Sequence, residues 1–149
     1  MVDKAELVGI ARKARPRAPM ESLESVSVTT ELGIDGDFRG KLRRRQVTIL
    51  AEEDWQAACQ EIGQNDIHWT ERRANLFVRG IALPRSKGSK LSIGDVVFEI
   101  TGETDPCNRM DAVAMGLQEA LRPDWRGGVT CRVIAGGTIT VGDQVIAET

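Results

Sequence analysis

The sequence contains a single histidine, His68, and three cysteines, no two of which are spaced as Cys-x-x-Cys. These absences exclude a multi-histidine metal site and argue against a zinc site or a dithiol redox motif. The Gly-x-Ser-x-Gly elbow, the Walker phosphate loop and the Gly-x-Gly-x-x-Gly fingerprint are missing too. The common signatures of serine hydrolases, nucleotide-binding proteins and dinucleotide-binding proteins are therefore not present. We interpret His68 as a surface or half-buried residue.

Long apolar runs are also missing, because no stretch approaches the roughly 18 residues that a membrane span requires. The first residues carry charges of both signs and lack the apolar segment of a secretion signal. The net charge of −2 favours neither nucleic acid nor an anionic membrane as a partner. We therefore expect a cytoplasmic protein that binds neither nucleic acid nor membrane.

Short apolar segments separated by turn residues predict a strand-rich fold. We expect strands within residues 5–14, 25–29, 46–50, 75–78, 91–100 and 129–147. Helical spacing predicts one helix from Trp55 to Ile62 and a second from Met110 to Leu121. The chain of 149 residues fits one domain over residues 1–149. The predicted fold is mainly β with helices, an antiparallel, closed or half-closed β-barrel.

The three cysteines have different predicted surroundings. Cys59 lies on the apolar stripe of the first helix and Cys131 lies between apolar residues of a strand, so we expect both in the core. Cys107 follows Asp105-Pro106 and lies at the start of the second helix, which Asp105 or Asn108 could cap. Unpaired backbone N–H groups at a helix start favour an anion, and hence a thiolate. The alternative is an unreactive surface thiol.

Basic residues are concentrated in two places. Arg72 and Arg73 form one pair, and five residues form a longer stretch: Arg39, Lys41, Arg43, Arg44 and Arg45. Arginines can hold a phosphate or another oxyanion through paired hydrogen bonds. The stretch from Arg39 to Arg45 is therefore a candidate anion site, and a solvated charged loop is the alternative.

These residues occur in an order that resembles the MOSC domain, the C-terminal domain of molybdenum cofactor sulfurases, which also occurs alone in bacteria. The matching segments are Gly36-Asp37-Phe38-Arg39-Gly40, Arg45-Gln46-Val47-Thr48, Arg73-Ala74-Asn75-Leu76, Gly80-Ile81-Ala82-Leu83, Ile93-Gly94-Asp95, Thr101-Gly102, Pro106-Cys107, Gly127-Gly128, Arg132-Val133, Gly136-Gly137 and Val141-Gly142-Asp143. The resemblance covers nearly the whole chain. It implies a β-barrel-like fold and an essential cysteine, which maps to Cys107.

The resemblance leaves three functions open. Amidoxime-reducing relatives imply that Cys107 is a catalytic residue and a ligand to the molybdenum of a pterin cofactor, in an enzyme that reduces N-hydroxylated compounds. Sulfurase relatives imply instead a carrier of persulfide sulfur for the assembly of metal–sulfur clusters or cofactors. In the third interpretation the protein is a non-catalytic module that binds an anion or small ligand, and Cys107 is incidental.

The resemblance also implies partners and binding residues. Arg45, Arg73, Asn75 and Arg132 match the family pattern and would contact a phosphate-bearing cofactor or small molecule. A separate protein would have to donate the electrons or the sulfur. A thiolate is a soft ligand, so binding of a transition metal by the Cys107 thiolate is chemically reasonable.

Overall fold

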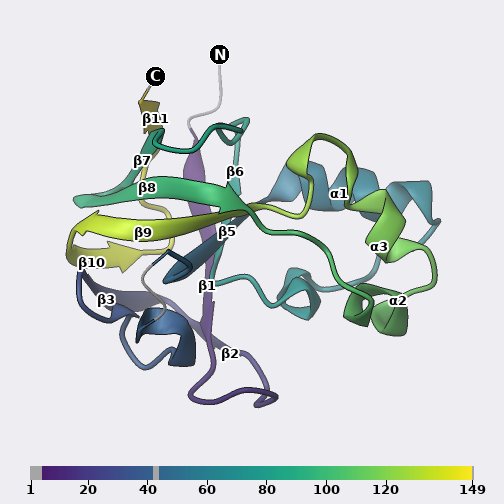
Figure 1. The fold of residues 1–149 in the computed structure, drawn as a ribbon, viewed down its shortest axis with the longest axis horizontal. Coiled ribbons are helices and arrows are strands. Elements are labelled where there is room, and N and C mark those ends of the chain that lie inside the picture. The colour runs from purple at the N-terminus through teal and green to yellow at the C-terminus, as the bar shows by residue number, and fades with distance from the viewer. Residues whose placement is uncertain (1–4, 42–43, 149) are drawn as a thin grey trace.

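The computed structural model describes residues 5–41 and 44–148, which form two β-sheets and a group of short helices (Figure 1). The strands are β1 (Glu6–Arg12), β2 (Glu21–Leu23), β3 (Ser25–Thr29), β4 (Gly33–Ile34), β5 (Val47–Ala51), β6 (Leu76–Arg79), β7 (Lys90–Ile93), β8 (Val96–Glu103), β9 (Val129–Ala135), β10 (Gly137–Thr140) and β11 (Val145–Glu148). The helices are α1 (Glu52–Glu61), α2 (Arg109–Val113) and α3 (Leu117–Ala120), with 3₁₀ turns η1 (Phe38–Lys41), η2 (Trp69–Arg72) and η3 (Pro123–Trp125). No helix of the described residues is long and apolar enough to cross a membrane.

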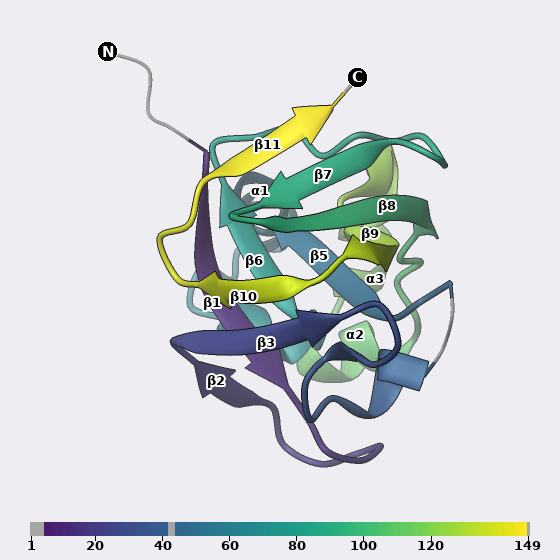
Figure 2. The ribbon, with the colours of Figure 1, turned by 90° about the vertical axis from the view of Figure 1, so that its left-hand side faces the viewer.

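The larger sheet has eight strands in the order β11-β7-β8-β9-β5-β6-β1-β2, and the smaller has the order β10-β3-β4. Neighbouring strands are antiparallel except β5 and β6, which are parallel. This confirms the predicted mainly β, antiparallel fold with a few helices. Figure 2 shows the smaller sheet in front of the larger one, and the helices α1, α2 and α3 lie behind the larger sheet.

Closure into a barrel is not found among the strands of the described residues, since the eight-stranded sheet has β11 and β2 as its two edges. The sheet does curl far enough for β1 to approach the turn before β11. There the N–H of Leu7 donates to the carbonyl of Asp143 at 2.9 Å, and Gly142 N–H donates to the carbonyl of Leu7 at 2.8 Å. Together with an isolated antiparallel bridge between Glu6 and Gln144, these bonds link the two ends of the fold without forming a continuous ladder. Of the predicted closed or half-closed barrel, the closed form is therefore not found among the described strands.

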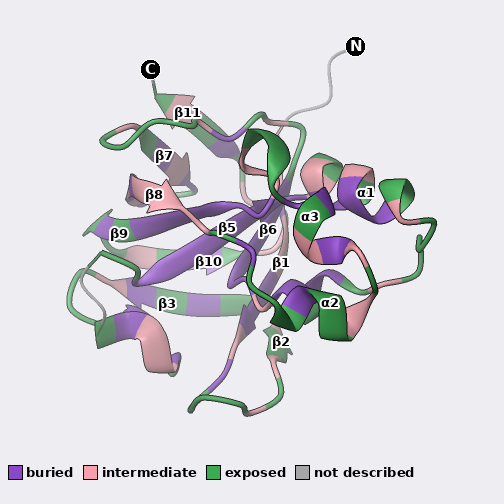
Figure 3. Ribbon diagram, turned by 45° about the vertical axis from the view of Figure 1, so that its right-hand side comes forward, coloured by how far each residue is buried: buried purple, intermediate pink, exposed green. Residues whose placement is uncertain are grey.

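The larger sheet is buried on both faces around β5 and β6. Ile49 and Leu76 point into the apolar core between the two sheets, whereas their neighbours Leu50 and Phe77 point toward the helices. Side chains of a strand alternate between its faces, so each short strand contributes to both cores. Figure 3 shows these central strands as mostly buried, with the helices exposing their outer faces.

The predicted second helix is broken, which corrects the interpretation of its spacing. Helix α2 ends where Ala114 is extended, and Gly116 has a φ of 89° before α3 begins. A left-handed glycine interrupts an α-helix, yet Met110 and Leu117 both remain buried in the helix-side core. Asn108 occupies the N-cap position of α2 but makes no side-chain capping bond. The predicted cap is therefore wrong, and Cys107 precedes a helix of five residues.

Candidate functional site

Cys107 is exposed, and it differs in this respect from the other two cysteines. Cys59 on α1 is 3% exposed and Cys131 on β9 is 0% exposed, which confirms their expected place in the core. Burial raises the pKa of both of these thiols, because it disfavours the charged form. Of the three, Cys107 is therefore the thiol that a solute can reach.

The Cys107 pocket is a cavity of about 540 Å³ between η1, the end of η2 and the segment that precedes α2. Seven of its lining side chains are basic: Lys13, Arg17, Arg39, Arg45, Arg72, Arg73 and Arg109. Among the described lining residues Asp105 is the single acidic one. Such an excess of one charge in a concave site attracts anions.

Arg72 fixes the backbone on two sides of Cys107. It is 7% exposed, and its Nε–H donates to the carbonyl of Gly127 at 3.1 Å while Nη2 donates to the carbonyl of Thr104 at 2.8 Å. Burial lowers the pKa of Arg72 to about 10, and the neighbouring Cys107 acts in the opposite direction. Arg72 is therefore a cation close to the thiol, and it is also the residue that ties the two segments together.

Gly127 makes this approach possible. A Cβ atom at this position would lie 2.5 Å from the carbonyl oxygen of Thr104 and 2.9 Å from Nη2 of Arg72. Real Cβ atoms do not approach a backbone oxygen that closely. Any side chain here would therefore separate Arg72 from the segment that carries Cys107.

Arg73 has a strained backbone and an unsatisfied side chain. Its φ is 67°, in the left-handed region that non-glycine residues seldom adopt, and its carbonyl accepts a hydrogen bond from Arg39 Nη1 at 2.8 Å. Two buried polar side-chain atoms of the pocket wall, Arg73 Nη1 and Thr104 Oγ1, have no hydrogen-bond partner among the described residues. Buried polar groups are normally paired, so orphans of this kind indicate a site for a polar ligand.

Lys13 follows β1 and is 4% exposed, although its side chain lines the pocket. Its backbone N–H donates to Asp37 Oδ1 at 3.0 Å, and its carbonyl accepts from the N–H of Phe38 at 2.9 Å. The ammonium lies 5.1 Å from the centre of the Phe38 ring. Burial, followed by the charges of Arg73 and Arg39, lowers the pKa of Lys13 to about 8. Sequence reasoning missed this residue, whose only signal is its place at the end of a predicted strand.

A model of the MOSC domain family matches residues 35–146. The chain belongs to this family. The resemblance found in the sequence is thereby confirmed. Within the described residues no group of three or more His, Cys, Asp or Glu side chains could hold a metal ion.

Solved structures share the fold of this MOSC domain. The YuaD protein from Bacillus subtilis aligns with a TM-score of 0.77 at 19% identity, over 96% of this chain and 94% of that one. YiiM from Escherichia coli aligns with a TM-score of 0.71 at 15% identity, over 97% of this chain and 70% of that one. YiiM from Geobacillus stearothermophilus gives 0.74 at 14%, over 97% and 75%. At these identities the likeness shows the fold alone. No curated protein matches the chain.

The structure brings only some of the predicted binding residues of the MOSC domain to the Cys107 pocket. Arg45 and Arg73 line it. Asn75 is fully buried beneath it, where Oδ1 accepts from the Thr48 N–H at 3.0 Å and Nδ2 donates to the carbonyl of Ala11 at 3.2 Å. Asn75 therefore joins β1 to β5 and supports the wall that carries Thr48.

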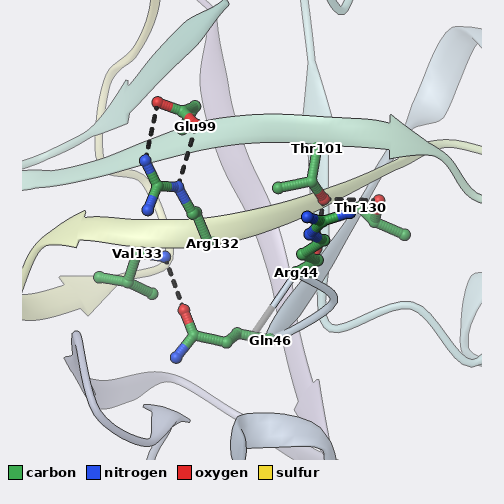
Figure 4. A network of polar contacts seen from close by, with 7 residues as sticks. All are labelled: Arg44, Gln46, Glu99, Thr101, Thr130, Arg132 and Val133. Atoms are coloured by element: carbon green, nitrogen blue, oxygen red, sulfur yellow. Dashed lines mark hydrogen bonds and ion pairs between the residues drawn. The ribbon is translucent and has the colours of Figure 1, made fainter. Parts of the chain in front are cut away.

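Arg132 lies elsewhere, on the surface of β9 (Figure 4). It forms a paired contact with Glu99 of β8, at 2.9 Å through Nε and 3.3 Å through Nη2. The Glu99 hydrogen bond raises the pKa of Arg132, and Arg132 lowers the pKa of Glu99. It is not among the described residues that line the Cys107 pocket. Arg43, part of the predicted basic stretch, lies outside the described residues.

Proposed function

We propose that the Cys107 pocket binds a molybdenum–pterin cofactor, with the thiol of Cys107 as metal ligand and the surrounding cations as the phosphate site. The observation that carries this proposal is the conjunction of one exposed thiol with seven basic side chains in a single cavity. A thiolate is a ligand for soft transition metals, and arginine holds phosphate oxygens through its planar group of donors. The cofactor has both chemical features.

The residues present fit this group. Nη1 of Arg73 and Oγ1 of Thr104 are buried without hydrogen-bond partners among the described residues, so a bound oxyanion or polar ring would supply what they lack. Arg39 is held by the carbonyl of Arg73 rather than by a carboxylate, which leaves its charge available to a phosphate. Burial lowers the pKa of Arg39, but a guanidinium stays protonated at neutral pH.

Each part of the pocket then has a task. Lys13, Arg39, Arg45 and Arg73 bind the phosphate, and Arg72 positions the segment carrying Cys107 through its bonds to Thr104 and Gly127. When bound, the molybdenum supplies two-electron redox chemistry, which the side chains cannot provide. Reduction of N-hydroxylated compounds, with electrons from a separate donor protein in the cytoplasm, is the activity we propose.

A persulfide carrier is the second candidate, and the exposure of Cys107 favours it. A sulfur carrier has to meet a donor and an acceptor protein in turn, so its thiol must be accessible. The terminal sulfur of a persulfide is anionic near neutral pH, and Arg72 beside Cys107 would stabilise that charge. A non-catalytic anion-binding module is the third candidate, because the cations alone could hold a phosphate.

Metal analysis separates the first candidate from the others. The full chain, purified from a host that makes molybdenum cofactor, should contain molybdenum in a near-stoichiometric amount. Cys107→Ala should lose that metal while Cys59→Ala, a change at a buried thiol on α1, should keep it. Wild-type protein without molybdenum, or a Cys107→Ala protein with as much as wild type, contradicts the proposal.

Intact mass tests the second candidate, and anion binding tests the third. After incubation with a cysteine desulfurase and cysteine, a carrier gains the mass of one sulfur atom at Cys107. An anion module binds pyrophosphate equally well in wild type and in Cys107→Ala, and gains neither metal nor sulfur. These outcomes are mutually distinguishable on the same preparations.

A further inference from the structure

Cys107 combines accessibility with an unusual charge environment. The thiol is exposed at a pocket with seven basic lining residues and one acidic one, in a chain whose net charge is −2. The rest of the chain therefore carries a clear net negative charge. The approach of a small solute to Cys107 is then governed by a local field of opposite sign to that of the whole chain.

Lys13 adds an independent indication of an anionic ligand. Lys13 is only 4% exposed, yet its side chain lines the pocket. In the part of the chain that the structure describes, no hydrogen bond or ion pair reaches its ammonium. The face of the Phe38 ring lies 5.1 Å away, and the Asp37 carboxylate favours its charge, against the opposing charges of Arg73, Arg39 and Arg109. Burial among several like charges makes this cation costly, and an anion in the pocket lowers that cost.

We propose that Cys107 is a site of reversible mixed-disulfide formation, selective for small anionic disulfides of the glutathione class, and that the basic side chains of the pocket set this selectivity. Carboxylates of such a disulfide would be held by Arg45, Arg73 and Lys13 as its sulfur meets that of Cys107. Cys59 and Cys131 are excluded because both are buried. The modification therefore has one target in the chain.

The exchange balances without another oxidant. The sulfur of Cys107, as thiolate, attacks one sulfur of the disulfide, so that one S–S bond forms while the original one breaks. The leaving thiolate departs with the electron pair of the broken bond and takes a proton from water. The disulfide is the oxidant, and excess thiol reverses the step by the same chemistry.

The consequence is control of the pocket by the redox state of small thiols. The mixed disulfide uses the same sulfur and the same cations that the cofactor would use, so the two exclude each other. This regulatory meaning rests on the proposed function, whereas the exchange itself rests only on the thiol and the pocket. Failure of one can therefore be told from failure of the other.

Rates with disulfides of different charge test the exchange. The full chain, produced in a host that makes no molybdenum cofactor, is reacted with glutathione disulfide, neutral hydroxyethyl disulfide and doubly cationic cystamine. Each rate is divided by that of free mercaptoethanol, which removes the intrinsic reactivity of the disulfide. We expect the normalised rate with glutathione disulfide to exceed that with cystamine by about tenfold or more at low salt. About 1 M salt should largely abolish the difference, because it shortens the screening length to about 3 Å.

Two variants locate the selectivity. Lys13→Met removes the ammonium of a buried residue, and Arg45→Gln removes an exposed pocket charge whose loss does not threaten folding. Each should reduce the anionic-to-cationic rate ratio several-fold, and this ratio is the quantity compared between variants. Lys90→Met, at an exposed lysine of β7 outside the pocket, is the matched control and should leave the ratio as in wild type.

Mass analysis completes the test. One glutathionyl group on Cys107, none on Cys107→Ala, and release by excess thiol support the inference. Equal normalised rates for all three disulfides, an adduct on Cys59 or Cys131, or a ratio untouched by both Lys13→Met and Arg45→Gln would overturn it. If the exchange occurs but the modified chain binds molybdenum cofactor as well as the reduced chain, the proposed control of the pocket is wrong and the exchange stands.

Discussion

The arginines that form ion pairs with carboxylates all lie outside the Cys107 pocket. Six arginines elsewhere form ion pairs with carboxylates: Arg12, Arg79, Arg85, Arg122, Arg126 and Arg132. No ion pair among the described residues involves any of the seven basic residues that line the pocket. Clustered like charges repel one another, so this arrangement is stable only because other interactions hold it.

The pocket cations are held by neutral acceptors instead. Arg72 donates to the carbonyls of Thr104 and Gly127, and Arg39 donates to the carbonyl of Arg73. A carbonyl satisfies the donor and fixes its direction but leaves the charge in place. For the anion that we propose as ligand, these cations are already in place, because nothing has to be released or reoriented when it binds.

The largest effect on stability is expected for Arg72→Met. The change leaves the carbonyls of Thr104 and Gly127 without their donor at a buried position, so the free energy of unfolding should fall by about 2–4 kcal/mol. Urea unfolding measures it. Arg122→Met, which removes an exposed i,i+3 ion pair, serves as control and should cost less than about 1 kcal/mol. Equal losses in the two variants would mean that Arg72 is no more than a surface charge.

Arg73→Met should separate binding from stability. Nη1 of Arg73 is buried without a partner among the described residues, so its removal should leave the free energy of unfolding within about 0.5 kcal/mol of wild type. The same variant should weaken pyrophosphate binding by roughly tenfold, since a charge-assisted bond to a ligand is worth about 1.5–3 kcal/mol. Titration calorimetry and urea unfolding on one preparation test both halves. A loss of stability with unchanged affinity would reverse our assignment of this residue.

The adjacent arginines show what the sequence could not reveal. Arg72 and Arg73 are equivalent in the sequence, yet one is a buried clamp and the other is a strained residue aimed at the pocket. The difference comes from acceptors 32 and 55 residues away in the chain and from the left-handed backbone of Arg73. Local patterns carry no information on partners at such separations.

Local patterns were sufficient where burial alone decides the structure. The spacing from Trp55 to Ile62 predicted α1, and apolar alternation predicted most strands, because one face of each element packs on a core. The same logic misled at Met110 to Leu121, where a left-handed Gly116 lets the chain bury the same residues without one continuous helix. For the site, the sequence singled out Cys107, Arg45 and Arg73, but Lys13 joins them only through the tertiary fold.

A pH dependence should follow from Lys13. Its pKa is lowered from 10.5 to about 8, so the folded chain releases this proton at lower pH than the unfolded chain. Between these values the unfolded state binds more protons, and the contribution of Lys13 to the free energy of unfolding therefore rises with pH. Sulfate keeps a constant charge over this range, and its affinity should fall several-fold as pH rises from 7 to 9. Measured in a Cys107→Ala background, which removes the thiol from the pocket, the fall should vanish on Lys13→Met.

The smallest effect is expected for Arg132→Gln, which tests the comparison from its other side. Arg132 matches the family pattern as well as Arg73 does, but it is an exposed residue paired with Glu99 on the strand surface. Exposed ion pairs contribute about 0–1 kcal/mol, so the free energy of unfolding, measured with urea, should fall by less than about 1 kcal/mol. Pyrophosphate affinity should equal that of wild type, because Arg132 is not among the described residues that line the Cys107 pocket. An affinity loss as large as that of Arg73→Met would mean that the ligand extends along β9. An arginine that forms an ion pair in the free protein could then still bind the ligand.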